Sequence, residues 1–99
     1  MITTKQRAQL KSIATNIDTI AQIGKDGLNE NVVKSLDLAL TARELIKIKV
    51  LNNCDIDIRE ICDKLCEVLK SEPVLVVGSK IILYRYSKKK DIKHIQLVK

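Results

Sequence analysis

Four consecutive residues, Gly24-Lys25-Asp26-Gly27, form the part of the sequence best suited to chemistry. They lie between a short β-branched stretch that predicts a strand and a segment that predicts the start of a helix. Two glycines let the backbone turn with positive φ and approach another backbone closely. A helix N-terminus offers free N–H groups and the positive end of its dipole at the same place. Because Lys25 adds a cation, the loop could bind the phosphates of a nucleic acid backbone.

A Gly-x-x-Gly loop is a weak signal by itself, because two glycines around an ordinary tight turn are common. KH domains use such a loop to clamp a short run of nucleotides. The segment is not a P-loop, since no Gly-Lys-Ser/Thr ending follows it. It is not a dinucleotide fingerprint either, because the third glycine and the acidic partner are missing. Nucleic acid binding and a simple turn therefore remain the two interpretations of the loop itself.

The net charge of +6 is concentrated at the C-terminal end of the 99-residue chain. Residues 80–99 hold seven cations and one anion, whereas residues 1–79 hold eleven of each. Such asymmetry favours a polyanionic partner, nucleic acid before membrane. The alternative is a solvated basic tail that aids solubility.

Hydrophobic periodicity and end signals predict seven elements. Thr3 and Gln6 fit a capping box before the first helix, and Asn29 fits the N-cap of the second. Gly78-Ser79 suits a two-residue hairpin. The expected elements are a helix over 4–15, a strand over 19–23, a helix over 30–42, a strand over 44–50, a third helix capped by Asp55 or Asp57, and strands over 74–77 and 81–85.

This order predicts an α/β fold: one small domain with a mixed four-stranded sheet and three helices. We expect the strand over 74–77 to be central, because it shows no polar alternation. We expect the domain to span residues 1–86 and residues 87–99 to form a basic, partly disordered tail.

Several blocks in matching order resemble the YhbY-like family, also called the CRM domain (chloroplast RNA splicing and ribosome maturation). They cover roughly residues 3 to 86: Thr4-Lys5-Gln6-Arg7 with Leu10-Lys11, the loop Ile23 to Asn29, the strand Glu44 to Val50, and Gly78 followed by Ile82-Leu83-Tyr84-Arg85. The chain departs from the family at Thr15-Asn16, where a histidine is frequent, and at Thr19, near which a proline is frequent. These departures affect any contact of that histidine but not the fold.

The resemblance implies a domain similar to the C-terminal domain of bacterial translation initiation factor three. It also implies a stand-alone bacterial protein that associates with large-subunit precursor particles, with RNA contacts at the loop and at nearby basic groups. If the first helix, the loop and the sheet edge converge, their cations form one positive surface. The predicted RNA-binding set is Gly24, Lys25, Asp26, Gly27, Lys5, Arg7, Lys11, Lys47, Lys49 and Arg85.

The chain has only two aromatic residues, Tyr84 and Tyr86. Readers of single strands stack bases on several aromatic rings. We therefore expect recognition by shape and phosphate, with Tyr84 in the core and Tyr86 as the better candidate for a contact.

Catalysis is not expected, because no serine, histidine and acid form a plausible triad. His94, the only histidine, lies in the basic tail, where we expect nothing to hold it. Asp55, Asp57 and Glu60 resemble a carboxylate cluster, but helix capping and dipole matching explain them. No cofactor is expected.

The three cysteines do not suggest a disulfide framework, since their number is odd and no export signal is recognisable. Cys62 and Cys66 would share one helix face, but third and fourth metal ligands are hard to find. We expect buried, reduced thiols and no metal.

No apolar run approaches the roughly 20 residues of a membrane-spanning helix. We expect a cytoplasmic protein that does not bind membranes.

The leading hypothesis is an RNA-binding assembly factor for the large ribosomal subunit, acting as a monomer. The alternatives are a protein–protein adaptor that docks through its sheet face or third helix, and a general nucleic-acid-binding domain without ribosomal preference.

Overall fold

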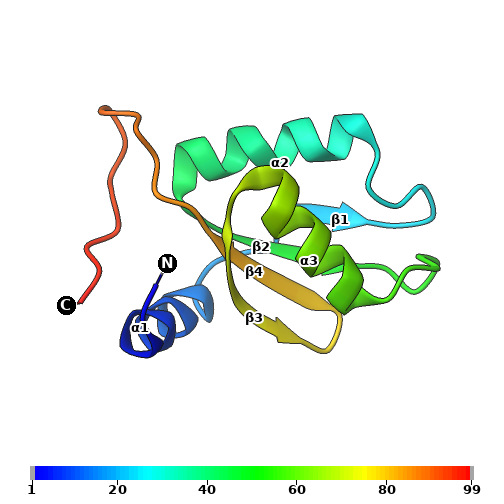
Figure 1. Cartoon of the computed structure of the whole chain (residues 1–99), viewed down its shortest axis with the longest axis horizontal. Helices are drawn as coiled ribbons and strands as arrows, with labels where there is room; N and C mark the ends of the chain where they lie inside the picture. The colour runs from blue at the N-terminus through cyan, green and yellow to red at the C-terminus, as the bar shows by residue number, and fades with distance from the viewer. Residues whose placement is uncertain (1, 99) are drawn as a thin grey trace.

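A computed structural model describes residues 2–98. The elements follow the predicted order of helix, strand, helix, strand, helix, strand and strand (Figure 1). They are α1 (Thr4–Ala14), β1 (Ala21–Ile23), α2 (Glu30–Arg43), β2 (Leu45–Val50), α3 (Ile58–Leu69), β3 (Glu72–Val77) and β4 (Lys80–Tyr84). The predicted small α/β fold with three helices and a mixed four-stranded sheet is confirmed.

The helices begin where side chains satisfy their free N–H groups. Thr3 and Gln6 form the predicted capping box, each side chain accepting from the backbone N–H of the other. The Asn29 side chain accepts from the N–H of Val32 at 2.9 Å. Of the two candidate caps for α3, Asp57 is the one found.

The four strands form one sheet in the order β1-β2-β4-β3. β1 is parallel to β2, whereas β4 is antiparallel to both β2 and β3. Gly78 and Ser79 make the tight connection between β3 and β4, with Gly78 at a φ of 56°. The predicted hairpin is therefore confirmed, and its glycine occupies the left-handed region that the turn requires.

The prediction that β3 is a central strand was wrong, because β3 lies at the edge of the sheet. Its apolar run arises because both faces are covered: Val74 packs on the α1 side and Val76 on the opposite side. Pro73 cannot donate to a ladder and is therefore confined to edges and bulges. The register shifts between Pro73 and Leu75. The proline was the signal that should have placed this strand at the edge.

The sheet separates two apolar layers. One layer joins α2 and α3 to the face that carries Ile46, Ile48, Ile81 and Leu83. The other joins α1 to the face that carries Leu45, Ile82 and Tyr84. The prediction that Tyr84 is a core residue is confirmed, since its side chain is 5% exposed.

After β4 the chain leaves the sheet and turns back beside α1 without forming a helix or strand (Figure 1). The side chains of Gln6 and Gln9 donate to the carbonyls of Val98 and Gln96 at 2.8 and 2.7 Å. Ile95 and Leu97 pack against the α1 layer. Residues 87–98 therefore cover part of the domain. None of the helices in the described residues is long and apolar enough to span a membrane.

Candidate nucleic-acid interface

The Gly-x-x-Gly loop, residues 24–27, is a tight turn at the end of β1 that leaves its two middle residues exposed. The N–H of Gly27 donates to the carbonyl of Gly24 at 3.0 Å and closes the turn. Gly27 is buried and has a φ of 62°, a conformation that favours glycine. A Cβ on Gly27 would lie 3.4 Å from Ile56 Cδ1, and one on Gly24 would lie 3.2 Å from Asn53 Oδ1. The glycines therefore let the loop pack closely on the β2–α3 connection.

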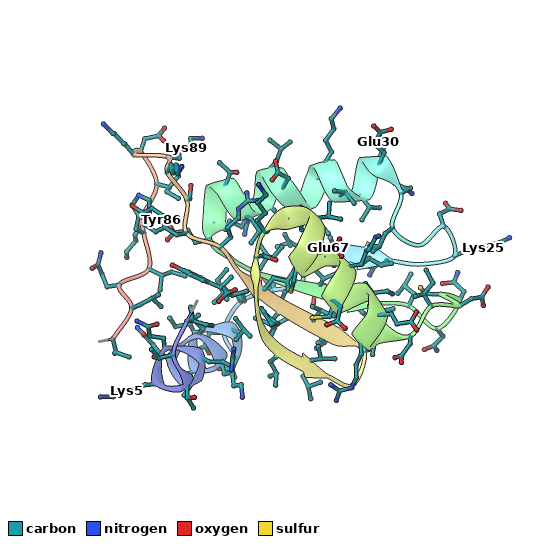
Figure 2. The ribbon with its side chains drawn as sticks, viewed as in Figure 1. Lys5, Lys25, Glu30, Glu67, Tyr86 and Lys89 are labelled. Carbon is teal, nitrogen blue, oxygen red and sulfur yellow. The ribbon has the colours of Figure 1, made fainter. Side chains whose placement is uncertain are left out.

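The turn leaves main-chain donors free at its tip. Within residues 2–98, no acceptor lies within bonding distance of the backbone N–H of Lys25, Asp26 or Leu28. Successive unpaired N–H groups in a turn form an anion-binding concavity. The side chain of Lys25 projects away from the body of the domain at the same tip (Figure 2). Amides and ammonium together could hold a phosphate oxygen.

The inner side of the loop has the opposite character. A cavity of about 580 Å³ lies between the loop and the start of α3, with an apolar lining that includes Leu28, Ile56 and Ile61. Its charged lining consists of three carboxylates and two lysines: Asp26, Asp55, Glu60, Lys25 and Lys64. Glu30 also occupies the first turn of α2, where it already meets the positive end of the helix dipole. A phosphate would therefore be repelled from the inner side, and the outer tip is the better place for it.

β2 carries two lysines of the predicted set, Lys49 near the end of the strand that adjoins the loop and Lys47 in its middle. Lys47 and Lys49 point to the α1 side, and Lys49 pairs with Gln22, two residues before Gly24. Lys80 stands directly opposite Lys49 on β4. Like charges in directly opposed positions destabilise a sheet, and a bound anion would relieve them.

Lys80 is a site candidate that sequence reasoning missed. The hairpin turn was recognisable, but the register between β2 and β4 joins residues that are 31 positions apart in the sequence. No local pattern revealed that pairing.

The start of α1 does not converge with the loop, so the condition for one continuous positive surface is not met there. Lys5 and Lys25 lie at opposite ends of the molecule (Figure 2). The guanidinium of Arg7 donates through Nε to the carbonyl of Pro73 at 3.2 Å, so it faces the β3 edge. Lys11 is exposed in the last turn of α1. The start of α1 is thus apart from the loop.

The sequence of residues 2–85 matches the family model described as the CRS1 / YhbY (CRM) domain. The chain belongs to this family. The resemblance inferred from its sequence blocks is thereby confirmed.

Known relatives of this CRM domain span nearly its whole length. It is 41% identical over 97 residues to the probable RNA-binding protein YqeI of Bacillus subtilis, covering 98% of this chain and 99% of the relative. It is 33% identical to the probable RNA-binding protein PA4753 of Pseudomonas aeruginosa, covering 89% and 85%. The solution structure of the hypothetical protein SAV1595 from Staphylococcus aureus superposes with a TM-score of 0.77 at 49% identity, covering 96% of this chain and all of the other.

Arg85, the last member of the predicted set, is committed to internal partners in this CRM domain. Its Nη1 donates to Asp37 Oδ1 at 2.7 Å and to the carbonyl of Leu69 at 3.0 Å. Its Nη2 donates to the carbonyl of Asp37 and to Thr41 Oγ1, both at 2.9 Å. The guanidinium therefore ties β4 to α2 and to the end of α3, and it has little left to offer an RNA phosphate.

Replacing Arg85 with alanine is expected to lower the free energy of unfolding by about 2–3 kcal/mol, since several acceptors lose a charged donor. Asp37→Ala should cost less than about 1 kcal/mol, because that carboxylate is exposed to solvent and its attraction is screened. Urea unfolding followed by circular dichroism measures both. Equal, small losses for the two variants would contradict the internal role of Arg85.

Glu44 is the structural residue that sequence reasoning missed most clearly. It was expected as the first residue of a strand, but it caps the C-terminus of α2 with a φ of 65° and is fully buried. Its Oε2 accepts from the N–H of Ser87 at 2.7 Å, and its Oε1 accepts from the N–H of Ile95 at 2.8 Å. Burial raises the pKa of Glu44, but these bonds and one from His94 outweigh burial and leave the pKa below its ordinary value.

The prediction that nothing would hold His94 was also wrong. Its Nδ1 lies 3.0 Å from Glu44 Oε2, and because a carboxylate only accepts, Nδ1 is the donor. The imidazole also stacks on the ring of Tyr86 at a centroid distance of 5.5 Å. The sequence did not indicate this partner, because 50 residues separate His94 from Glu44.

The cysteines are free thiols, and α3 places Cys62 and Cys66 on one face as expected. Cys62 is buried, whereas Cys54 and Cys66 are only half-buried, so the expectation of buried thiols holds for one of the three. A hydrogen bond to Cys66, reinforced by burial, raises the pKa of Cys62. The same bond lowers the pKa of Cys66 to about 7, although burial opposes it. Within residues 2–98, no three His, Cys, Asp or Glu side chains are grouped to hold a metal ion.

Proposed function

We propose that this CRM domain binds structured ribosomal RNA and acts in assembly of the large ribosomal subunit. The observation that carries the proposal is the exposed tip of the Gly-x-x-Gly loop, where the backbone N–H groups of Lys25 and Asp26 are unpaired within residues 2–98 and the Lys25 side chain projects outward. Two relatives that match most of the chain are named probable RNA-binding proteins. Both observations favour RNA as the partner.

The mode of binding follows from the groups that are available. Lys47, Lys49 and Lys80 add positive charge on the α1 side of the sheet. Only Tyr86 offers an exposed aromatic ring among the described residues, so there is no platform for stacking a run of bases. Phosphate contacts fix position without reading sequence. We propose that the protein recognises the shape and backbone of folded RNA.

We propose that the protein acts as a monomer in the cytoplasm, bound to large-subunit precursor particles. Sedimentation of cell extract at low and at high salt tests this. The protein should travel with large-subunit precursors at low salt and remain near the top of the gradient at high salt. Failure to enter the ribosomal fractions at low salt would contradict the proposal.

Binding to RNA should depend strongly on salt, because each neutralised phosphate releases counterions. With about 4–6 phosphate contacts, the slope of log affinity against log salt should be roughly −3 to −5. Titrations of the purified protein against fragments of large-subunit RNA measure this slope. A slope near zero would show that the lysines do not carry the binding.

A further inference from the structure

We propose that residues 86–94, here called the C-terminal basic loop, form a second RNA-binding surface that takes unpaired nucleotides. One base would stack on Tyr86, and the adjoining phosphates would meet the lysines of the loop. The inference rests on the proposed RNA binding but concerns a surface distinct from the Gly-x-x-Gly loop.

The C-terminal basic loop is held in one shape by a single buried carboxylate. Glu44 accepts from the N–H of Ser87 near the start of the loop and from the N–H of Ile95 just after its end. The hydroxyl of Ser87 also donates to the carbonyl of Thr41 at 2.6 Å, and the N–H of Lys89 donates to Ser87 Oγ at 3.2 Å. A loop fixed before binding loses less entropy when a ligand arrives. The basic segment is thus a positioned structure rather than a freely solvated tail.

The positioned segment presents a concentration of unpaired positive charge. Asp91 is the only acid of the loop. Its four lysines are all exposed: Lys88, Lys89, Lys90 and Lys93. No ion pair joins any of these lysines to a carboxylate within residues 2–98. Holding like charges together costs free energy, which a polyanion would recover.

Tyr86 gives the surface a stacking partner for a base. Tyr86 is 64% exposed, whereas the other tyrosine of the chain is buried. The rings of Tyr86 and His94 are nearly parallel, with an interplanar angle of 19°. One face of Tyr86 is therefore supported by an imidazole that Glu44 holds, and the exposed remainder is free for another ring. Stacking on an aromatic side chain tolerates any base.

The two RNA-binding surfaces lie at opposite ends of the domain. Tyr86 and Lys89 lie at one end of the longest axis and Lys25 at the other (Figure 2), and the domain is 38 Å long. A short run of nucleotides held at one loop cannot reach the other. The protein would therefore hold two separate segments of RNA, or two distant parts of one.

The charge of the loop is tested with K88A/K89A/K90A in the full-length protein. The probe is a fluorescent 20-nucleotide oligouridylate, titrated at several salt concentrations and followed by anisotropy. The matched control is K34A/R43A/R59A, which removes three exposed cations outside both surfaces. Losing three phosphate contacts should reduce the magnitude of the salt slope by about 2, since a single strand releases about 0.7 counterions per contact. Equal losses in the two triple variants would overturn the inference.

The stacking role is tested with Tyr86→Leu and Tyr86→Phe. Leucine keeps an apolar side chain but removes the ring, and it should weaken oligouridylate binding about 5- to 100-fold. Phenylalanine should leave the affinity within about twofold, because stacking needs the ring and not the hydroxyl. Unchanged affinity in Tyr86→Leu would overturn this part, and thermal unfolding confirms that both variants are folded.

The experiment separates this inference from the proposed function. If Lys25→Glu leaves binding of a large-subunit RNA fragment unchanged while K88A/K89A/K90A weakens oligouridylate binding, the loop at Gly24–Gly27 fails and the C-terminal basic loop stands. If Lys25→Glu weakens binding of the fragment while K88A/K89A/K90A binds oligouridylate as the matched control does, the proposed function stands and the second surface is refuted.

Discussion

Replacing Glu44 with alanine should lower the free energy of unfolding by about 3–4 kcal/mol, because one buried and one half-buried N–H group lose their acceptor and a void remains. The N–H groups of Ser87 and Ile95 lie 43 and 51 residues from Glu44, so the lost bonds also release the C-terminal segment from the domain. Urea unfolding followed by circular dichroism at neutral pH measures the loss.

Glu67→Ala is the matched control for Glu44→Ala, since Glu67 is an exposed carboxylate in α3. It should change the free energy of unfolding by less than about 0.5 kcal/mol. If Glu44→Ala loses as little stability as the control, Glu44 does not hold the C-terminal segment on the domain.

The contribution of Glu44 should also depend on pH in a defined direction. Its pKa is lowered in the folded protein, so the carboxylate stabilises the fold above the ordinary carboxyl range and loses this contribution as pH falls through the lowered pKa. The difference in stability between the wild type and Glu44→Gln should therefore be largest near neutral pH and shrink in acid. The titratable groups that face this carboxylate are His94 and Tyr84.

Replacing Lys25 with glutamate should lower the affinity for ribosomal RNA by about 30-fold or more. The change removes one charge-assisted contact and puts an anion beside the phosphate, together about 2 kcal/mol or more. The fold should be unaffected, because Lys25 is exposed at the loop tip. Filter binding with a large-subunit RNA fragment measures the affinity, and sedimentation should show the variant leaving the ribosomal fractions.

The control for Lys25→Glu is Lys34→Glu, which makes the same change of charge at an exposed position on α2. It should leave most of the affinity intact.

A protein–protein adaptor would tolerate Lys25→Glu and keep its association with ribosomal particles, so normal sedimentation of the Lys25→Glu variant would favour that alternative. Competition with duplex DNA separates ribosomal preference from general nucleic acid binding.

Local signals were sufficient for much of the fold. Thr3, Asn29 and Asp57 could be recognised as caps because a cap depends on residues only two or three positions away. The Gly78–Ser79 turn was recognisable for the same reason. The Gly-x-x-Gly loop was recognised as well, since a glycine in a turn indicates a positive φ, which Gly27 adopts.

The features that were missed depend on pairings between distant residues. β3 lies at the edge because β2 pairs with β4 rather than with β3. Only Pro73 indicated this position in the sequence. The Lys49–Lys80 pair is a consequence of the same pairing. Glu44 resembled an ordinary polar residue before a strand, because its partners lie far along the chain.

The partners of Arg85 in the candidate site also could not be predicted from the local sequence. Its position at the end of a strand favoured a surface cation, but α2 and the end of α3 supply acceptors that enclose its guanidinium. Sequence alone identifies which side chains carry charge. Which of those charges are already satisfied depends on the tertiary fold.

We propose that backbone amides of the Gly-x-x-Gly loop donate to RNA phosphates. Amide chemical shifts of the ¹⁵N-labelled protein, followed by NMR during titration with a large-subunit RNA fragment, test it directly. The amides of Lys25, Asp26 and Leu28 should shift at the first additions of RNA, and Lys25→Glu should suppress those shifts. If these amides stay unchanged while RNA binds and other residues shift, the claim is contradicted.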